Sequence, residues 1–259
     1  MKAMWTESVR PLLMERQNCT LHSVTLRVLG GESDIEYKVR DLLENPNPTA
    51  AIYCKTGECE IRITARARSD EDGEKMCRAY AKKFYDLLGD AVYDEDVAGL
   101  EETVVHTLQE KGLTIATAES CTGGLTAKRL TDVPGASAVF LGGVVSYTNG
   151  VKNHVLGVPA SLLESYGAVS APVARAMAMG VRVLTGSDLA LSVTGLAGPD
   201  GDDRGNPVGT VFAALSAPEG VFVRQLALGG DRERIRTLSA HHALDLLRRY
   251  LTDQMTEGE

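Results

Sequence analysis

The stretch T-I-A-T-A-E-S-C-T-G-G-L-T-A-K-R-L, residues 114–130, decides the fold of this chain. Residues 113–118 form a short apolar run with β-branched members, which indicates a strand, and residues 125–130 have the spacing of an amphipathic helix. The Gly-rich turn between them places backbone N–H groups and the Ser120 hydroxyl at the carboxyl end of the strand, where an anion or a developing oxyanion can be held. The candidate binding residues of the turn are Thr122, Gly123 and Gly124.

Strands and helices alternate along the rest of residues 98–259. The expected helices cover residues 100–111, 125–130, 159–166 and 172–184, a segment that opens at Asn149, and a final helix capped by Asp231. The expected strands cover residues 113–118, 139–147, 188–194, 208–215 and 221–228. This order, with an antiparallel pair late in the chain, predicts a three-layer α/β sandwich on a mixed sheet.

Residues 1–97 are expected to form a separate small α/β domain with one covered sheet face. An amphipathic segment at 4–16 precedes it, and the acidic segment 90–99 is expected to link the two domains. The expected elements are strands at 20–29, 50–55 and 58–66, a helix with Ser33 as its cap and Glu36 completing a capping box, and a helix at 71–88. KH modules that bind RNA share this order, but their G-x-x-G loop is absent here, so RNA binding is not expected.

Composition restricts the partners. Apolar residues make up 44% and charged residues 24% of the chain, as in soluble globular proteins. The net charge is −8, and the row Arg62, Arg66 and Arg68 stands among acidic residues, so nucleic acid is not an expected partner. No apolar run approaches the roughly 20 residues of a spanning helix, and the first residues lack the layout of a signal peptide. A cytoplasmic protein without membrane contact is therefore expected.

The cysteines do not suggest a framework of disulfide bonds. There are five of them, they are scattered, and none has the C-x-x-C spacing of a zinc site. Cys54 and Cys59 bracket the turn at Thr56-Gly57 and could face each other across a hairpin. Free thiols are nevertheless expected, because a reducing cytoplasm disfavours disulfides. The sequence predicts neither a disulfide framework nor a metal site.

Three loops follow strands, at residues 119–124, 146–152 and 194–207, and in an open α/β sheet such loops can meet at the carboxyl edge. Ser120 needs a base to become a nucleophile, and histidines are poorly placed for this. Lys152 is one of three lysines after residue 97, and a lysine near a helix N-terminus is disfavoured unless it has another use. A Ser120/Lys152 dyad is therefore a candidate.

Two alternatives stay open at this point. Cys121 is a rival nucleophile, because it is adjacent to Ser120 and also near a helix N-terminus. The acidic run at Asp200, Asp202 and Asp203 has the composition of a metal loop, but it lacks the alternation of an EF-hand. A polar turn that closes over a ligand is the expected role of that run.

A family resemblance adds to this reading. The motifs A-E-S-C-T-G-G, V-P-G-A-S, S-Y-T-N-G-V-K, G-A-V-S, V-T-G-L-A-G-P-D-G and P-V-G-T-V closely resemble the C-terminal domain of the CinA family, over residues 98–252. Stand-alone members of that family are nicotinamide-nucleotide amidases. Residues 20–95 resemble the KH-like middle domain of CinA. The molybdopterin-binding-like domain that precedes it in long members is expected to be absent. The activities of that domain, including ADP-ribose hydrolysis, are expected to be absent.

The resemblance implies an enzyme that hydrolyses the carboxamide of nicotinamide mononucleotide, without metal or cofactor. The implied catalytic residues are Ser120, Lys152 and Tyr147. The candidate substrate-binding residues are Thr122, Gly123, Gly124, Asn149, Thr194, Gly195, Gly198, Arg204 and Arg234, the two arginines as candidates for the phosphate. The family often has a lysine where this chain has Asn206, which puts affinity in doubt.

Two further alternatives concern function, and one expectation concerns assembly. The chain could be a ligand-binding or interaction protein that keeps the fold without turnover, or an amidase for another small amide. A homodimer is expected, and the Ala/Met-rich segment 172–184 could be buried in it as easily as in the monomer core.

Overall fold

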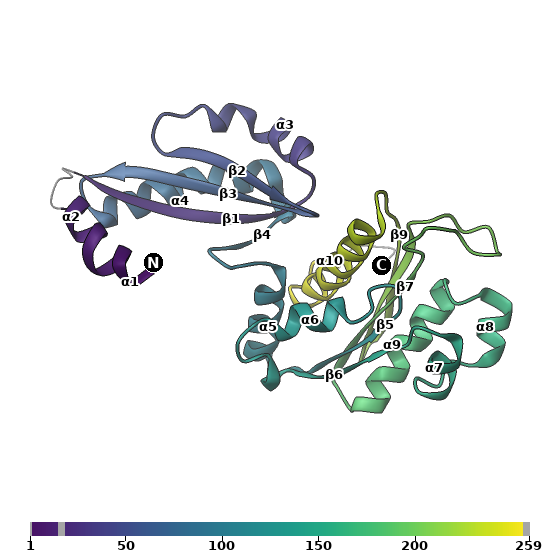
Figure 1. The fold of residues 1–259 in the computed structure, drawn as a ribbon. Coiled ribbons are helices and arrows are strands. Elements are labelled where there is room, and N and C mark those ends of the chain that lie inside the picture. Colours follow the sequence, from purple (N-terminus) through teal and green to yellow (C-terminus); the bar gives the residue numbers. More distant parts are fainter. Residues whose placement is uncertain (1, 15–18, 256–259) are drawn as a thin grey trace. The chain divides into compact units, whose positions relative to one another are not determined.

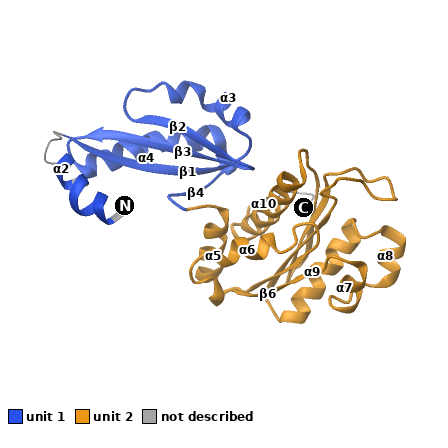
Figure 2. Ribbon diagram, in the orientation of Figure 1, with its two compact units in different colours: residues 1–97 blue, residues 98–259 orange. Residues whose placement is uncertain are grey.

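The computed structural model describes residues 2–14 and 19–255 (Figure 1). The chain divides into two compact units, Met1–Val97 and Ala98–Glu259 (Figure 2). In the described residues, no helix combines the length and the apolar character that crossing a membrane requires. Each unit has its own sheet and its own core, so each is described by itself.

Unit 1 is a four-stranded antiparallel sheet with two helices on one face. The strands are β1 (Thr20–Leu29), β2 (Thr49–Lys55), β3 (Glu58–Ala67) and β4 (Val92–Glu95), in the order β2-β3-β1-β4. The covering helices are α3 (Glu32–Leu43) and α4 (Asp70–Leu88). Apolar residues alternate along β3, so Ile61 and Ile63 meet Phe84 of α4 in the core while Arg62 stays exposed on the other face.

The segment before β1 is helical where the structure describes it. It consists of α1 (Lys2–Met4), a π-helical turn η1 (Trp5–Val9) and α2 (Arg10–Met14). The last two residues of the predicted segment, 15 and 16, lie outside the described residues. A short 3-10 turn, η2 (Gly89–Ala91), follows α4.

Three expectations for unit 1 are wrong. Ser33 does not cap α3, because the helix already begins at Glu32, with Gly31 as its N-cap and no side-chain cap. The expected acidic link is partly β4, which pairs with β1. The side chain of Glu95 in β4 contacts α4, because it accepts a hydrogen bond from Tyr85 Oη at 2.8 Å.

The third error concerns the cysteines. Cys54 and Cys59 face each other in the register of β2 and β3, and they form a disulfide. Free thiols were expected from the compartment, whereas the hairpin register brings the two side chains together.

Unit 2 is built on a five-stranded mixed sheet with the order β6-β5-β7-β8-β9. Its strands are β5 (Ile115–Glu119), β6 (Phe140–Val145), β7 (Leu189–Gly195), β8 (Thr210–Ala217) and β9 (Gly220–Ala227). The first three in this list are parallel, and β8 and β9 are antiparallel additions to β7. Every residue of β5 and β8 is buried, as expected for strands covered on both faces.

Helices cover both faces of this sheet, which confirms the predicted three-layer sandwich (Figure 1). One layer contains α5 (Leu100–Lys111), α6 (Leu125–Thr131) and α10 (Arg232–Leu251). The other contains α9 (Ala171–Thr185), with α7 (Asn149–His154) and α8 (Ala160–Tyr166) beside it; a 3-10 turn, η3 (Ala136–Ala138), precedes β6. Because β5, β6 and β7 are parallel, the loops after them emerge at one edge of the sheet.

The close approach of α9 to the chain after α7 depends on Gly180. A Cβ atom at this position would overlap the carbonyl oxygen of Leu156, which is backbone and cannot move aside cheaply. By contrast, a Cβ atom at Gly150 in α7 would meet nothing nearer than Thr148 Oγ1, at 3.9 Å. Substitution of Gly150 by alanine is therefore a suitable control for substitution of Gly180.

We expect Gly180→Ala to lower the free energy of unfolding by about 1–3 kcal/mol, because the added methyl group forces the backbone at Leu156 to shift. Gly150→Ala should be neutral or should stabilise the protein by up to about 1 kcal/mol, since it restricts the unfolded chain without a clash. Chemical denaturation of the full chain measures both. Equal effects of the two substitutions would contradict this account of the contact.

Candidate active site

The three loops after β5, β6 and β7 meet around a cavity of about 250 Å³, as the sequence predicts. The start of α10 contributes to the same wall. The predicted site residues on the wall are Ser120, Tyr147, Asn149, Lys152, Thr194, Gly195 and Gly198. The predicted site residues that do not line it are Thr122, Gly123, Gly124, Arg204 and Arg234.

Lys152 is the most unusual residue of the cavity because its side chain is almost completely buried, with 1% exposed. It lies in the short helix α7, which is capped by Thr148, whose side chain accepts a hydrogen bond from Val151 N. Within residues 2–14 and 19–255, its amino group has two polar partners: Nζ lies 2.9 Å from Ser120 Oγ and 2.7 Å from the carbonyl oxygen of Ser146. The lysine therefore faces the serine that the sequence pairs with it.

The surroundings of Lys152 favour its neutral form. Burial removes water from the ammonium group and lowers the pKa of Lys152 from 10.5 to about 8. A neutral amine can accept the proton of a neighbouring hydroxyl, which an ammonium group cannot do. The arrangement can therefore activate Ser120 near neutral pH.

Ser120 is held in place by the sheet. It follows β5 directly, and its backbone N–H donates to the carbonyl oxygen of Val193 on β7 at 2.9 Å. Its side chain is 9% exposed, so the hydroxyl reaches the cavity without facing bulk water.

The rival nucleophile, Cys121, has a different environment. It also lies on the cavity wall, and with 6% exposed it is about as buried as Ser120. Among the described residues, however, Lys152 Nζ donates to Ser120 Oγ and not to Cys121. Burial raises the pKa of its thiol to about 11, so the reactive thiolate is disfavoured. The geometry favours Ser120 over Cys121 as the group that Lys152 can deprotonate.

The turn after Ser120 is organised by a buried carboxylate that sequence reasoning did not identify. Glu119 is 1% exposed, and its side chain accepts hydrogen bonds from the backbone N–H groups of Gly124, Thr126 and Ala127 at 2.8 to 3.0 Å. A carboxylate at a helix N-terminus satisfies donors that have no partner within the helix. Glu119 therefore occupies the anion position that the sequence assigns to a ligand.

The two glycines of the turn have a conformational role. Gly123 and Gly124 have φ angles of 59° and 95°, in the left-handed region that favours glycine. Gly123 N donates to the Ser120 carbonyl oxygen at 3.1 Å, and Gly124 N donates to Glu119. Neither N–H group is left for an oxyanion. The two glycines therefore shape the turn and do not bind substrate through their N–H groups, contrary to the expectation.

The arginine at the cavity is Arg232, which sequence reasoning missed. Its Nη1 donates to the Gly198 carbonyl oxygen at 2.7 Å, and its Nη2 donates to Tyr147 Oη at 2.9 Å. A signal was available, because Asp231 caps α10 and a basic residue directly after a cap is disfavoured by the helix dipole. The hydroxyl of Tyr147 is thus engaged with Arg232, whereas the expectation paired it with Lys152.

The other two predicted arginines have different positions. Arg204 donates from Nη1 to the Ser165 carbonyl oxygen at 2.9 Å and from Nη2 to that of Glu164, so it covers the C-terminal end of α8. Arg234 is exposed in the first turn of α10, away from the cavity wall. Neither arginine is placed to hold a ligand in the cavity.

The acidic loop 200–206 is held by its own hydrogen bonds. Asp202 accepts from the backbone N–H groups of Arg204 and Asn206, and from Asn206 Nδ2 at 2.8 Å. In the described part of the chain, no group of three or more His, Cys, Asp or Glu side chains has the arrangement of a metal site. Asn206 thus stabilises the loop through its hydrogen bonds to Asp202. Asp200 lies on the cavity wall.

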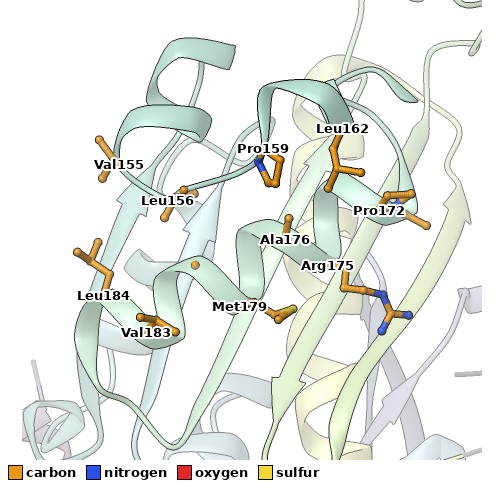
Figure 3. A pocket seen from close by; sticks show the side chains of 13 residues that line it. Val155, Leu156, Pro159, Leu162, Pro172, Arg175, Ala176, Met179, Val183 and Leu184 are labelled. Carbon is orange, nitrogen blue, oxygen red and sulfur yellow. The ribbon is translucent and has the colours of Figure 1, made fainter. Parts of the chain in front are cut away.

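A larger apolar cavity of about 930 Å³ lies between the α7 and α8 segment and α9 (Figure 3). Its wall consists of side chains such as Leu156, Leu162 and Met179. The charged side chain on it, Arg175, donates to the Val221 carbonyl oxygen at 2.9 Å. Because this wall carries no nucleophile or base, the cavity at Ser120 is the candidate active site.

A family model described as "CinA C-terminal domain" matches residues 97–251, which include every residue of this cavity. The chain belongs to the CinA family. A second model, "Damage-inducible protein CinA KH domain", matches residues 23–93, within unit 1. The KH-like fold predicted for the first domain is therefore confirmed.

Relatives and solved structures agree with this membership. The chain is 46% identical to a CinA-like protein of Dictyoglomus turgidum and 45% identical to one of Kosmotoga olearia, over 96% and 97% of its own length. It spans about 61% of the length of these CinA relatives.

Crystal structures of CinA proteins resemble about 60% of this chain. The competence damage-inducible protein A (ComA) of Klebsiella pneumoniae has a TM-score of 0.59 at 33% identity, over 60% of this chain and 97% of that one. The competence/damage inducible protein CihA of Agrobacterium tumefaciens has a TM-score of 0.56 at 39% identity, over 59% and 95%.

Proposed function

We propose that this CinA-family chain hydrolyses the carboxamide of nicotinamide mononucleotide to nicotinate mononucleotide and ammonia. The observation that carries the proposal is the buried Lys152 amino group 2.9 Å from Ser120 Oγ, at the wall of a cavity. A nucleophile with a base in hydrogen-bond reach is what acyl transfer requires. The substrate is the one that the family resemblance implies.

The proposed first half of the reaction forms an acyl-enzyme. Neutral Lys152 takes the hydroxyl proton of Ser120 as Oγ attacks the carboxamide carbon, and the carbonyl oxygen becomes an oxyanion. The C–N bond then breaks, and Lys152 gives its proton to the leaving nitrogen, which departs as ammonia. Ser120 is left as an ester of the pyridine carboxyl group.

The second half returns the enzyme to its starting state. A water molecule gives a proton to Lys152 and attacks the ester carbon, and the second tetrahedral intermediate forms. The bond to Ser120 Oγ breaks, Lys152 returns the proton to Oγ, and the product leaves as the carboxylic acid, which loses its proton to solvent water and becomes the carboxylate. This balance requires only water as a second reactant.

Arg232 is the proposed partner of the substrate phosphate. It lies on the cavity wall beside Gly198, and its guanidinium group can donate to phosphate oxygens in a bidentate manner. The contact of Arg232 with Tyr147 Oη orients the guanidinium group on the cavity wall. Arg204 and Arg234 are not proposed for this role, because neither lines the cavity.

The first experiment measures ammonia release from nicotinamide mononucleotide by the purified chain. We expect turnover in the wild type, loss of at least about 1,000-fold in Ser120→Ala, and retention in Cys121→Ala, because Ser120 carries the acyl group. Turnover that survives Ser120→Ala would contradict the mechanism. A folded wild type that releases no ammonia would favour the ligand-binding alternative or another amide.

The second experiment measures the pH dependence of kcat/KM. Lys152 acts as a base only when it is neutral, and its pKa is lowered to about 8. The rate should therefore rise about tenfold per pH unit below about pH 8 and level off above it. A profile that is flat between about pH 6 and about pH 9 would exclude Lys152 as the base.

The third experiment separates the arginines of α10. Loss of a charged hydrogen bond to the phosphate should raise KM for nicotinamide mononucleotide by about 10- to 100-fold in Arg232→Met. Arg234→Met, which removes the same charge two residues away, should leave KM unchanged. Nicotinamide riboside lacks only the phosphate, so its kcat/KM should be insensitive to Arg232→Met. Equal effects on both substrates would argue against a phosphate contact.

A further inference from the structure

Three arginines stand at alternate positions in the first turns of α10, and each has different surroundings. Arg232 lies on the cavity wall and Arg234 is exposed to solvent. Arg236 is half-buried and reaches the turn that follows Ser120. The mechanism above uses only the first of them.

Arg236 donates hydrogen bonds to two carbonyl groups of the turn that follows Ser120. Its Nε donates to the Cys121 carbonyl oxygen at 3.1 Å, and its Nη2 donates to the Thr122 carbonyl oxygen at 2.7 Å. The guanidinium group is planar, so two such bonds fix the orientation of both peptide groups. A Cβ atom on Gly123 would lie 3.4 Å from Nη2, which is van der Waals contact.

The N–H groups of this turn can be accounted for one by one. Ser120 N donates to Val193, Gly123 N donates to the Ser120 carbonyl oxygen, and Gly124 N donates to Glu119. Among the described residues, the Thr122 N–H has no hydrogen-bond partner, but Thr122 does not line the cavity. Within the same described part of the chain, the Cys121 N–H has no partner besides its own sulfur, which is a weak acceptor. Cys121 lies on the cavity wall, directly after the nucleophile.

These bonds form a continuous chain of peptide groups that ends at this N–H. The Arg236 guanidinium binds the Thr122 carbonyl, and the N–H of that same peptide group, Gly123 N, binds the Ser120 carbonyl. The N–H of the Ser120 peptide group is Cys121 N. Hydrogen bonds in series polarise one another, by roughly 10–30% per bond, and here a full positive charge stands at the start of the series.

We propose that Arg236 is a positioning residue that orients and polarises the Cys121 N–H as the donor to the oxyanion formed at Ser120. The proposal rests on the Ser120 acyl transfer proposed above, but it does not depend on the identity of the amide. It assigns Arg236 to the acylation step rather than to substrate binding.

The test uses acylation of Ser120 by p-nitrophenyl acetate, because this ester forms an oxyanion at Ser120 whether or not nicotinamide mononucleotide is the natural substrate. The rate of p-nitrophenolate release is measured in the full chain, with Ser120→Ala as the background. Arg236→Gln should slow acylation roughly 10- to 100-fold, less than the loss expected for a deleted oxyanion donor. Arg236→Lys keeps the charge and part of the hydrogen bonding, so its acylation rate should fall between those of the wild type and Arg236→Gln.

The matched control is Arg234→Gln, which removes an equal charge from the same helix and should stay within about twofold of wild type. KM for the ester and the pH midpoint near 8 should not move in the Arg236 variants, because Arg236 does not contact Lys152. Thermal unfolding checks that the variants are folded. If Arg236→Gln is unfolded, Arg236→Lys carries the test.

Several results would overturn the proposal. They are an unchanged acylation rate in a folded Arg236 variant, a shift of the pH midpoint together with the rate, and an effect on KM alone. Wild type that acylates at Ser120 but releases no ammonia from nicotinamide mononucleotide would reject the proposed substrate and leave this test valid. Wild type that does not acylate at Ser120 at all would reject both.

Discussion

Burial of the Lys152 amino group beside Ser120 is the constraint on which the second unit depends. An ammonium group that loses its water is costly, and here the cost appears as a pKa lowered to about 8. Its two polar contacts come from the ends of neighbouring parallel strands, at Ser120 after β5 and Ser146 after β6. Ser146 N also donates to the Glu119 carbonyl oxygen at 2.7 Å, so the strand register itself places both partners of the lysine.

The turn that carries Ser120 is held from two sides by opposite charges. The Glu119 carboxylate binds N–H groups at the start of α6 from within the fold, and the Arg236 guanidinium binds carbonyl groups of the same turn from α10. With both sets of backbone groups fixed, the turn has little freedom to move during a reaction. Helix α10 therefore supports the site at two points, because Arg232 also donates to Gly198 and Tyr147 on the cavity wall.

Much of the fold and part of the site could be predicted because their signals are local. Apolar periodicity located the elements, and the Gly-rich turn located Ser120. The scarcity of lysine after residue 97 singled out Lys152. Errors arose where contacts between distant segments decide the outcome. The strand β4 exists because it pairs with β1, and Cys54 meets Cys59 because the hairpin register places them opposite each other.

The sequence by itself determined the family, the order of strands and helices, and the candidate pair of nucleophile and base, since these follow from neighbouring residues and from recognisable motifs. Only the tertiary structure decided which of three arginines on α10 faces the cavity, that Glu119 fills the helix N-terminus, and that Tyr147 contacts Arg232. The physical reason is that side-chain direction and hydrogen-bond partners depend on segments that are distant in the chain, and composition and spacing carry no information about those distances.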